Sequence, residues 1–269
     1  MDPELLKVIK AASLVEKNGY EYARYLEEVF SDDPALVKAA WDWAAEEVQH
    51  GDALGRWSEI ADPGFNFDEA FEDFEKTILL PQDIGASVRG SRTGEFIARC
   101  IVECGTSSLY ATIAAATDEP VLKQISQNIA ADELRHYKLF YGYAKRYQSE
   151  ENLSRWQRFK IALARVAETD DDELSYAYYA ANHRADGPYD RETYNKLYVA
   201  RAYNIYQFRH IEQAAAMAFK AVGLKPHGWL CMTFAKLSFR FMKFRVRRFR
   251  KWEAKQEMAR ARADAASPA

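Results

Sequence analysis

Glu47-Val48-Gln49-His50 and Glu133-Leu134-Arg135-His136 are two stretches of one form, a glutamate followed three residues later by a histidine. On a helix, this spacing puts the carboxylate and the imidazole on the same face. The chain has five histidines, and two of them lie in these stretches. Two helices with this motif, together with two helices that each supply one glutamate, form the di-metal site of a four-helix bundle. The two stretches therefore predict an all-α fold with a metal site.

The composition agrees with a helical protein. Of 269 residues, 48% are hydrophobic, and only 12 Gly and 8 Pro interrupt the chain, which favours long helices around a sizeable core. The three cysteines form no disulfide framework. No stretch has the pattern of a signal peptide or a membrane span. We therefore expect a cytoplasmic protein.

The hydrophobic pattern predicts four long helices, each ended by turn or capping residues. They cover about residues 3–30, 34–60, 93–116 and 120–147. Residues 65–91 form a long crossover, with one short amphipathic piece, between the second and the third helix. Residues 1–150 are therefore expected to fold as a ferritin-like four-helix bundle.

The phase of each predicted helix identifies the side chains that face the core. In every helix, a glutamate interrupts a stripe of apolar and small residues. Glu21 and Glu46 fall on the outer flanks of their helices and are not part of these stripes. The core-facing candidates for metal ligands are Glu16, Glu47, His50, Glu103, Glu133 and His136.

Six ionisable side chains in one core would be very costly without partners. Two divalent cations resolve this cost, because four carboxylates neutralise four positive charges and two neutral imidazoles complete the ligand set. Oxygen and nitrogen ligands without thiolate suit iron or manganese. The sequence therefore predicts two iron ions, with manganese as the alternative.

The flanks of these motifs resemble those of a known family, the soluble acyl-carrier-protein desaturases of the ferritin-like di-iron superfamily. The stretches that carry the resemblance are WAAEEVQHGD at 43–52, ECGT at 103–106 and IAADELRH at 129–136. The resemblance covers roughly residues 35–147. It does not extend to the short segment before the first helix, to the crossover or to the basic end of the chain.

The resemblance implies roles for seven residues. It makes iron ligands of the five candidates that lie between 47 and 136, whereas Glu16 is assigned by helix phase and order alone. It places the hydroxyl of Thr106 near the oxygen-binding side of the cluster, as a catalytic group. It makes Asp132 the outer hydrogen-bond partner of the His50 imidazole.

The expected activity is an oxygen-dependent desaturation or hydroxylation of a fatty acyl or lipid chain, carried or not by an acyl carrier protein. Electrons would come from an external donor such as a ferredoxin, because the chain has no flavin or nicotinamide motif and no cysteine cluster. The same ligands also serve aldehyde deformylation, N-oxygenation, or iron and peroxide handling of the ferritin or rubrerythrin type. The sequence leaves these alternatives, and a homodimer, open.

Residues 151–225 are expected to add helices that pack on the bundle. The pattern predicts a helix at 154–168, a tyrosine-rich helix capped by the aspartates at 170–172, and one helix over 191–222. His183 and His210 lack a glutamate three residues before them. We interpret both as structural residues.

Charge divides the chain into an acidic and a basic part. Residues 1–154 contain 15 Lys and Arg against 28 Asp and Glu, a net charge of −13, and residues 155–269 contain 22 against 12, a net charge of +10. Residues 226–269 are expected to form a basic amphipathic helix and a short tail. Phe and Trp alternate with Lys and Arg over 229–252.

Three interpretations of this basic helix remain open. It can pack on the bundle with its basic side solvated, lie on an anionic membrane surface, or bind an acidic protein. Nucleic acid is not an expected partner, because the body of the protein is acidic. The expected location is therefore the cytoplasm, with peripheral contact at the membrane surface as the second alternative.

Overall fold

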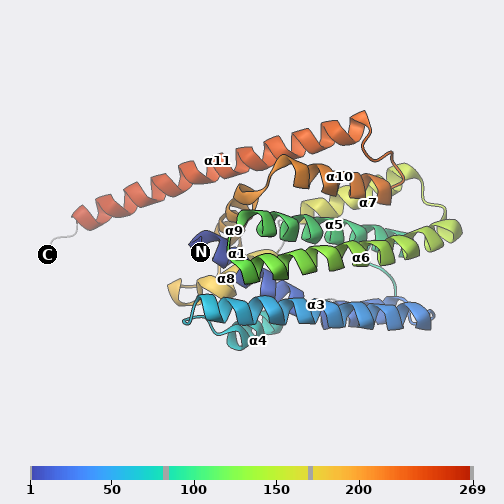
Figure 1. Cartoon of the computed structure of the whole chain (residues 1–269), viewed down its shortest axis with the longest axis horizontal. Helices are drawn as coiled ribbons and strands as arrows, with labels where there is room; N and C mark the ends of the chain where they lie inside the picture. Colours follow the sequence, from blue (N-terminus) through green and yellow to red (C-terminus); the bar gives the residue numbers. More distant parts are fainter. Residues whose placement is uncertain (1, 81–84, 169–171, 267–269) are drawn as a thin grey trace.

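The computed structural model describes residues 2–80, 85–168 and 172–266, and all the regular structure within these residues is helical. The predicted all-α fold is thereby confirmed. The ligand candidates lie in the first part of the chain, whose long helices run side by side (Figure 1). These helices are α1 (Pro3–Lys17), α2 (Gly19–Val29), α3 (Pro34–Ala61), α5 (Arg92–Ala116) and α6 (Pro120–Glu151).

Local sequence signals fix where α3 and α6 begin. Both helices have proline at their first position. A backbone N–H at this position would have no acceptor within the helix, so proline, which lacks the N–H, costs no hydrogen bond there. The side chain of Asp33 accepts a hydrogen bond from the N–H of Leu36 at 3.2 Å. Glu119 caps α6 in the same way, through the N–H groups of Val121 and Leu122.

The helix predicted over 3–30 is wrong in one respect, because it breaks at Asn18 into α1 and α2. Asn18 adopts φ −77° and ψ 8°, outside helical geometry. The buried stripe that contains Glu16 nevertheless continues into α2. A Cβ at Gly19 would lie 2.7 Å from Cβ of Glu47. The missing side chain of Gly19 therefore lets the break pack directly on α3 beside a candidate ligand.

Contacts between helices give their directions. Glu46 of α3 contacts His136 of α6. One turn later in α3, His50 contacts Asp132, which lies one turn earlier in α6. α3 and α6 are therefore antiparallel. α5 and α6 are also antiparallel, because only a short turn after Ala116 joins them.

It follows that α3 and α5 run in the same direction. The chain between them returns along the length of the molecule (Figure 1) and contains α4 (Phe67–Thr77). This is the long crossover predicted over 65–91. Residues 81–84 of the crossover lie outside the described residues.

Two apolar clusters fill the space between these helices. One surrounds Phe96 and Phe140, whose ring centroids are 5.9 Å apart. The other surrounds Leu54 and Ile113. Along α3 and α6, the candidate ligands lie between the residues of the first cluster and those of the second, and Glu16 lies between the second cluster in α1 and the first cluster in α2. The metal candidates therefore occupy a polar layer with apolar packing on both sides.

The remaining helices pack on this core. They are α7 (Arg155–Ala167), α8 (Asp172–Asn182), α9 (Arg191–Ile205), α10 (Phe208–Ala221) and α11 (Trp229–Ala266), with a 3-10 turn at Arg184–Asp186. α8 packs on α1, and both α7 and α10 pack on α5. Asp170 and Asp171, which were expected to cap the tyrosine-rich helix, lie outside the described residues.

The prediction of a single helix over 191–222 is wrong. The backbone is extended at Tyr206, and this break divides the segment into α9 and α10. A contact from α11 stabilises this break. The Lys243 amine donates to three carbonyl oxygens at the end of α9, those of Tyr203, Asn204 and Tyr206, at 3.5, 3.2 and 3.0 Å. In a continuous helix, these oxygens would accept backbone N–H groups four residues later. Here the ammonium group takes that role.

The basic helix expected at the end of the chain is present as α11. It runs along one edge of the molecule and extends past the other helices (Figure 1). It spans Trp229–Ala266, within the predicted 226–269. Within the described part of the chain, no helix combines the length and the apolar character needed to cross a membrane.

Candidate metal centre

Six ionisable side chains meet in the polar layer between the two apolar clusters. α1 and α5 each supply a glutamate, and α3 and α6 each supply a glutamate and a histidine. All six are buried, with exposed fractions between 1% and 7%. The structure thus brings together every candidate ligand inferred from the sequence: Glu16, Glu47, His50, Glu103, Glu133 and His136.

The six side chains divide into two groups that have two carboxylates in common, Glu47 and Glu133. In the first group, one ligand atom from each of Glu16, His50 and the two shared glutamates lies within 4.8 Å of all the others. In the second group, Glu103 and His136 join the same two glutamates. Each group offers three carboxylates and one imidazole and could hold one metal ion.

Both imidazoles turn Nδ1 toward the centre. Nδ1 of His50 lies 3.4 Å from Oε1 of Glu133. Nδ1 of His136 lies 2.9 Å from Oε1 of Glu47 and 3.7 Å from Oε2 of Glu103. The centroids of the two rings are 5.8 Å apart. The nitrogen atoms that could bind metal therefore face the shared carboxylates.

One buried polar atom on each of the six side chains makes no hydrogen bond of good geometry with another described residue, although Nδ1 of His136 lies 2.9 Å from Oε1 of Glu47. These atoms are Oε2 of Glu16, Oε1 of Glu47, Nδ1 of His50, Oε2 of Glu103, Oε1 of Glu133 and Nδ1 of His136. Each such atom costs about 1–3 kcal/mol when it stays unpaired. Carboxylate oxygen and imidazole nitrogen are ligands that iron and manganese accept. The residues present therefore fit a pair of metal ions.

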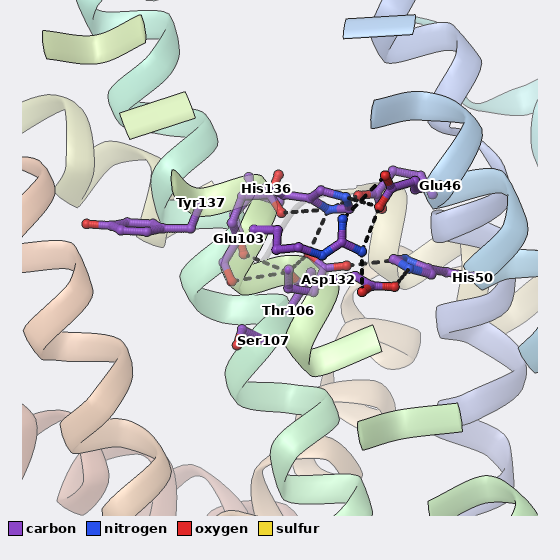
Figure 2. A network of polar contacts seen from close by, with 12 residues as sticks. Glu46, His50, Glu103, Thr106, Ser107, Asp132, His136 and Tyr137 are labelled. Carbon is purple, nitrogen blue, oxygen red and sulfur yellow. Dashed lines mark hydrogen bonds and ion pairs between the residues drawn. The ribbon is translucent and has the colours of Figure 1, made fainter. Parts of the chain in front are cut away.

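The outer nitrogen of each imidazole meets a carboxylate from the opposite helix. Nε2 of His50 lies 3.2 Å from Oδ2 of Asp132, and Nε2 of His136 lies 3.1 Å from Oε2 of Glu46 (Figure 2). Such a partner fixes the tautomer and the orientation of the ring, so that Nδ1 keeps its lone pair for the centre. The contact of Asp132 is the one that the family resemblance implied.

Helix phase alone gave no role to Glu46 and placed it on the outer flank of α3. In the structure Glu46 is half-buried and supports His136. The sequence does contain a signal for this role, because an acidic residue comes directly before the glutamate of both motifs. Each motif therefore supplies the outer partner for the histidine of the other, in a crosswise arrangement.

Arg135 joins the two outer carboxylates. Its guanidinium forms an ion pair with Glu46 at 3.2 Å and another with Asp132. The Arg135 side chain is 56% exposed, so it forms the solvent side of the network. A continuous set of polar contacts thus leads from the protein surface to both imidazoles.

Two hydroxyl groups hold inner carboxylates. Oγ1 of Thr106 donates to Oε2 of Glu133 at 2.7 Å, so Thr106 orients one of the shared ligands. The hydroxyl of Tyr110 donates to Oε1 of Glu16 at 2.6 Å. Tyr110 was not predicted as a site residue. Its signal in the sequence is its position two turns after Glu103, on the same face of α5.

The charges of the centre are strongly coupled. Burial raises the pKa of Glu47 and of Glu103 well above the usual range, and the nearby Glu133 carboxylate adds to both shifts. Burial also acts on Glu133, but the two imidazoles lower its pKa. Burial opposes the charge of His50, yet the adjacent carboxylates raise its pKa to about 11. Without a cation, bound protons therefore balance the negative charge.

The two histidines interpreted as structural make their contacts elsewhere. Nδ1 of His183 lies 2.6 Å from Oδ2 of Asp186. Nδ1 of His210 lies 2.7 Å from Oγ1 of Thr112, which ties α10 to α5. These contacts involve none of the six candidate ligands.

A cavity of about 400 Å³ lies beside α5. Ala98 and Val102 of α5 form part of its wall, and Leu79 and Leu80 of the crossover face it. Val102 directly precedes Glu103 in the chain. The cavity therefore extends along α5 to the level of the metal candidates.

No family model matches this chain, and comparisons with curated proteins and with solved structures found no match either. The function is therefore argued from the geometry of the centre and from the chemistry of its side chains.

Proposed function

We propose that this protein is an oxygen-dependent di-iron oxidoreductase, a desaturase or hydroxylase, that acts on a fatty acyl or lipid chain. Manganese is the alternative metal. The observation that carries the proposal is that Glu47 and Glu133 each belong to both ligand groups. Two ions that share carboxylates lie close enough to act on one small molecule together.

The scaffold that we propose is a ferritin-like four-helix bundle. In that arrangement, two helices supply a Glu-x-x-His motif and the other two supply one glutamate each. Here α3 and α6 contain the motifs, and α1 and α5 contain the single glutamates. The parallel direction of α3 and α5, joined by the long crossover, supports the same topology.

The ligand set divides evenly between two ions in this proposal. Glu16 and His50 would complete the first site, and Glu103 and His136 would complete the second. Bound iron would supply the redox chemistry that activates oxygen for reaction at a C–H bond. The apolar clusters on both sides of the layer would keep bulk water away from the reacting atoms.

The remaining polar groups hold the ligands and provide a proton. Asp132 and Glu46 keep each imidazole in the tautomer that presents Nδ1. Thr106 keeps a proton on Oγ1 at 2.7 Å from Glu133, where it can be passed to a neighbouring oxygen atom. Tyr110 holds the Glu16 carboxylate in place.

The cavity beside α5 is the proposed site for the substrate. Its apolar wall of Ala98, Val102 and Leu80 would hold a hydrocarbon chain. The rest of the lining is largely charged, and its Arg99 and Arg165 are paired with Glu95 and Glu168. An acyl chain would contact the apolar part of this lining, and its polar head group would contact the charged part.

Electrons for the reaction would come from outside the chain. All three cysteines, Cys100, Cys104 and Cys231, are buried and free. Three cysteines are too few for an iron–sulfur cluster with four thiolate ligands. A soluble donor of the ferredoxin type is the partner that we propose.

Metal content tests the centre. Protein loaded with ferrous iron without oxygen should hold about two ions per chain. Glu103→Gln should lower this number. Glu95→Gln is the matched control, because Glu95 is also a buried glutamate of α5, 3% exposed against 1% for Glu103, and binds Tyr25 instead. Equal iron in the Glu103→Gln variant and the wild type would disprove the assignment.

Acyl profiles test the substrate. Cells with the active protein should contain unsaturated or hydroxylated acyl species that cells with the Glu103→Gln variant lack. Unchanged acyl species, together with two bound irons, would retain the metal centre and reject the lipid substrate. Deformylation would instead shorten aldehydes, and an iron store would accumulate many more than two irons per chain.

A further inference from the structure

α11 has apolar side chains on two opposite faces. The inner face is formed by Cys231, Ala235, Met242 and Val246, which are 8% exposed or less. It packs on α9 and α10. This face explains how α11 joins the molecule, but it uses only part of the apolar surface of the helix.

Basic residues on the inner side fix α11 in place. Lys243 caps the end of α9 through three carbonyl oxygens. Arg250 donates to Oδ1 of Asn204 at 2.8 Å, and Arg245 lies 3.4 Å from Oδ1 of Asn195. These contacts are spread over two turns. The rotation of α11 about its axis is therefore determined, and so is the face that it turns outward.

The outer face carries a row of large apolar side chains. They are Leu230, Leu237, Phe241 and Phe244, with exposed fractions of 51%, 59%, 57% and 54%. Their spacing of seven, four and three residues puts them on a single helical stripe. Single exposed apolar residues are common, but a continuous stripe marks an interaction surface.

Basic residues flank and extend this stripe. The exposed members are Lys236, Arg240, Arg247, Arg248, Lys251 and Arg250, which also contacts Asn204. Residues 229–252 contain eight Lys and Arg and no Asp or Glu. Long basic side chains can cover apolar surface with their stems while the charged ends reach outward. The outer face of α11 therefore combines apolar and positive character along its length.

We propose that the outer face of α11 lies on an anionic lipid bilayer, in the plane of its surface. An interfacial helix needs an apolar stripe that enters the acyl boundary and basic residues that meet the lipid phosphates. The outer face supplies Phe241 and Phe244 for the first requirement and Arg240 and Arg247 for the second.

The charge of the whole molecule supports this occupant. Residues 1–154 carry a net charge of −13, so an anionic surface repels the body and attracts α11. α11 runs along an edge of the molecule, where a flat surface can reach its outer face (Figure 1). The bilayer would therefore bind the molecule in a single orientation.

The same features disfavour other occupants. A second copy of α11 would bring like charges together, because residues 229–252 contain no acidic side chain. Nucleic acid would pair with the basic residues but would leave Leu237, Phe241 and Phe244 without an apolar partner. A lipid surface satisfies both kinds of side chain at once.

Vesicle co-sedimentation of the full chain tests the proposal. The wild type should sediment with vesicles of phosphatidylcholine and phosphatidylglycerol, but not with phosphatidylcholine alone, and salt should weaken the binding. The combined variant Leu237→Ser, Phe241→Ser and Phe244→Ser should bind at least about tenfold more weakly. Trp156→Ser is the control, because Trp156 is 62% exposed on α7 and should not affect binding.

A second variant separates charge from apolar contact. Arg240→Gln, Arg247→Gln and Arg248→Gln together should reduce binding to the anionic vesicles by at least about tenfold. Lys38→Gln with Lys138→Gln removes exposed charge from α3 and α6 instead and should preserve binding. Far-ultraviolet circular dichroism should show the same helix content in all variants.

Three results would overturn the proposal. The first is equal sedimentation of the serine variant and the wild type, and the second is equal binding to neutral and anionic vesicles. The third is a dimer in light scattering that the serine variant abolishes, without any vesicle binding, which would assign the face to a second copy. The Glu103→Gln variant should bind vesicles like the wild type, because this proposal does not depend on the metal centre.

Discussion

Oε2 of Glu46 lies 3.1 Å from Nε2 of His136 and joins α3 to α6 at the outer wall of the candidate metal centre. Asp132 and His50 make the matching contact in the opposite sense. Each helix thus supports the imidazole of the other.

Removing one of these outer carboxylates should weaken metal binding without unfolding the protein. We expect Glu46→Ala to lower the affinity by about 10- to 100-fold, because His136 loses the partner that fixes its tautomer and orientation. Competition with a chelator measures the change. Asp42→Ala is the control, since Asp42 is an exposed residue one turn earlier in α3. An unchanged affinity in Glu46→Ala would exclude this supporting role.

The close packing at Gly19 makes a prediction about stability. Gly19→Ala should lower the free energy of unfolding by about 1–3 kcal/mol and reduce metal content, because its Cβ would meet Glu47 at 2.7 Å. Gly142→Ala in α6, where no atom lies within 4 Å, should instead raise the stability by up to about 1 kcal/mol. Denaturant unfolding of both variants distinguishes packing from helix propensity. A neutral Gly19→Ala would show that α2 can move away from α3.

Substitutions at Thr106 test whether its hydroxyl group is needed to hold Glu133 for metal binding. Thr106→Val should weaken metal binding, because Oε2 of Glu133 loses the donor at 2.7 Å. The loss of one hydrogen bond to a charged group is worth about 1.5–3 kcal/mol. Thr106→Ser keeps the hydroxyl and should restore the affinity. If Val keeps the affinity and Ser loses it, the methyl group rather than the hydroxyl matters at this position.

The pKa shifts predict how metal-free protein responds to pH. Glu47, Glu103 and His50 have raised pKa values in the folded protein, so they bind extra protons on folding, and stability is lost as pH rises. The lowered pKa of Glu133 acts mainly below about pH 4. The melting temperature of chelated protein should therefore fall from about pH 5 to about pH 8.

The loaded protein should respond in the opposite direction. Metal binding requires deprotonated carboxylates and neutral imidazoles, so the affinity should increase over the same pH range. Melting curves with and without iron, recorded at each pH, give both trends. A metal-free melting temperature that rises with pH would contradict the assigned shifts.

The six candidate ligands could be found from the sequence because a helix repeats its faces regularly. A glutamate within an apolar stripe stands out even when the exact ends of the helix are unknown, as Glu16 shows. The break at Asn18 escaped the same reasoning, since the stripe continues through it without a change of phase.

The features that could not be predicted depend on distant parts of the chain. The break before α10 is stabilised by Lys243, which lies far along the sequence in α11. The role of Glu46 depends on how α6 approaches α3, and no pattern within α3 alone contains that information. The basic amphipathic helix was predicted, but which of its apolar side chains face outward depends on how α11 packs on α9 and α10.

The crosswise support of the two histidines limits how this centre could be moved to another protein. A designer who copies the α3 motif alone transfers a ligand pair whose histidine has lost its orienting carboxylate, together with a carboxylate that has nothing to orient. Only α3 and α6 together, at their present spacing, give both histidines their orienting carboxylates, and the ligand set still needs Glu16 of α1 and Glu103 of α5.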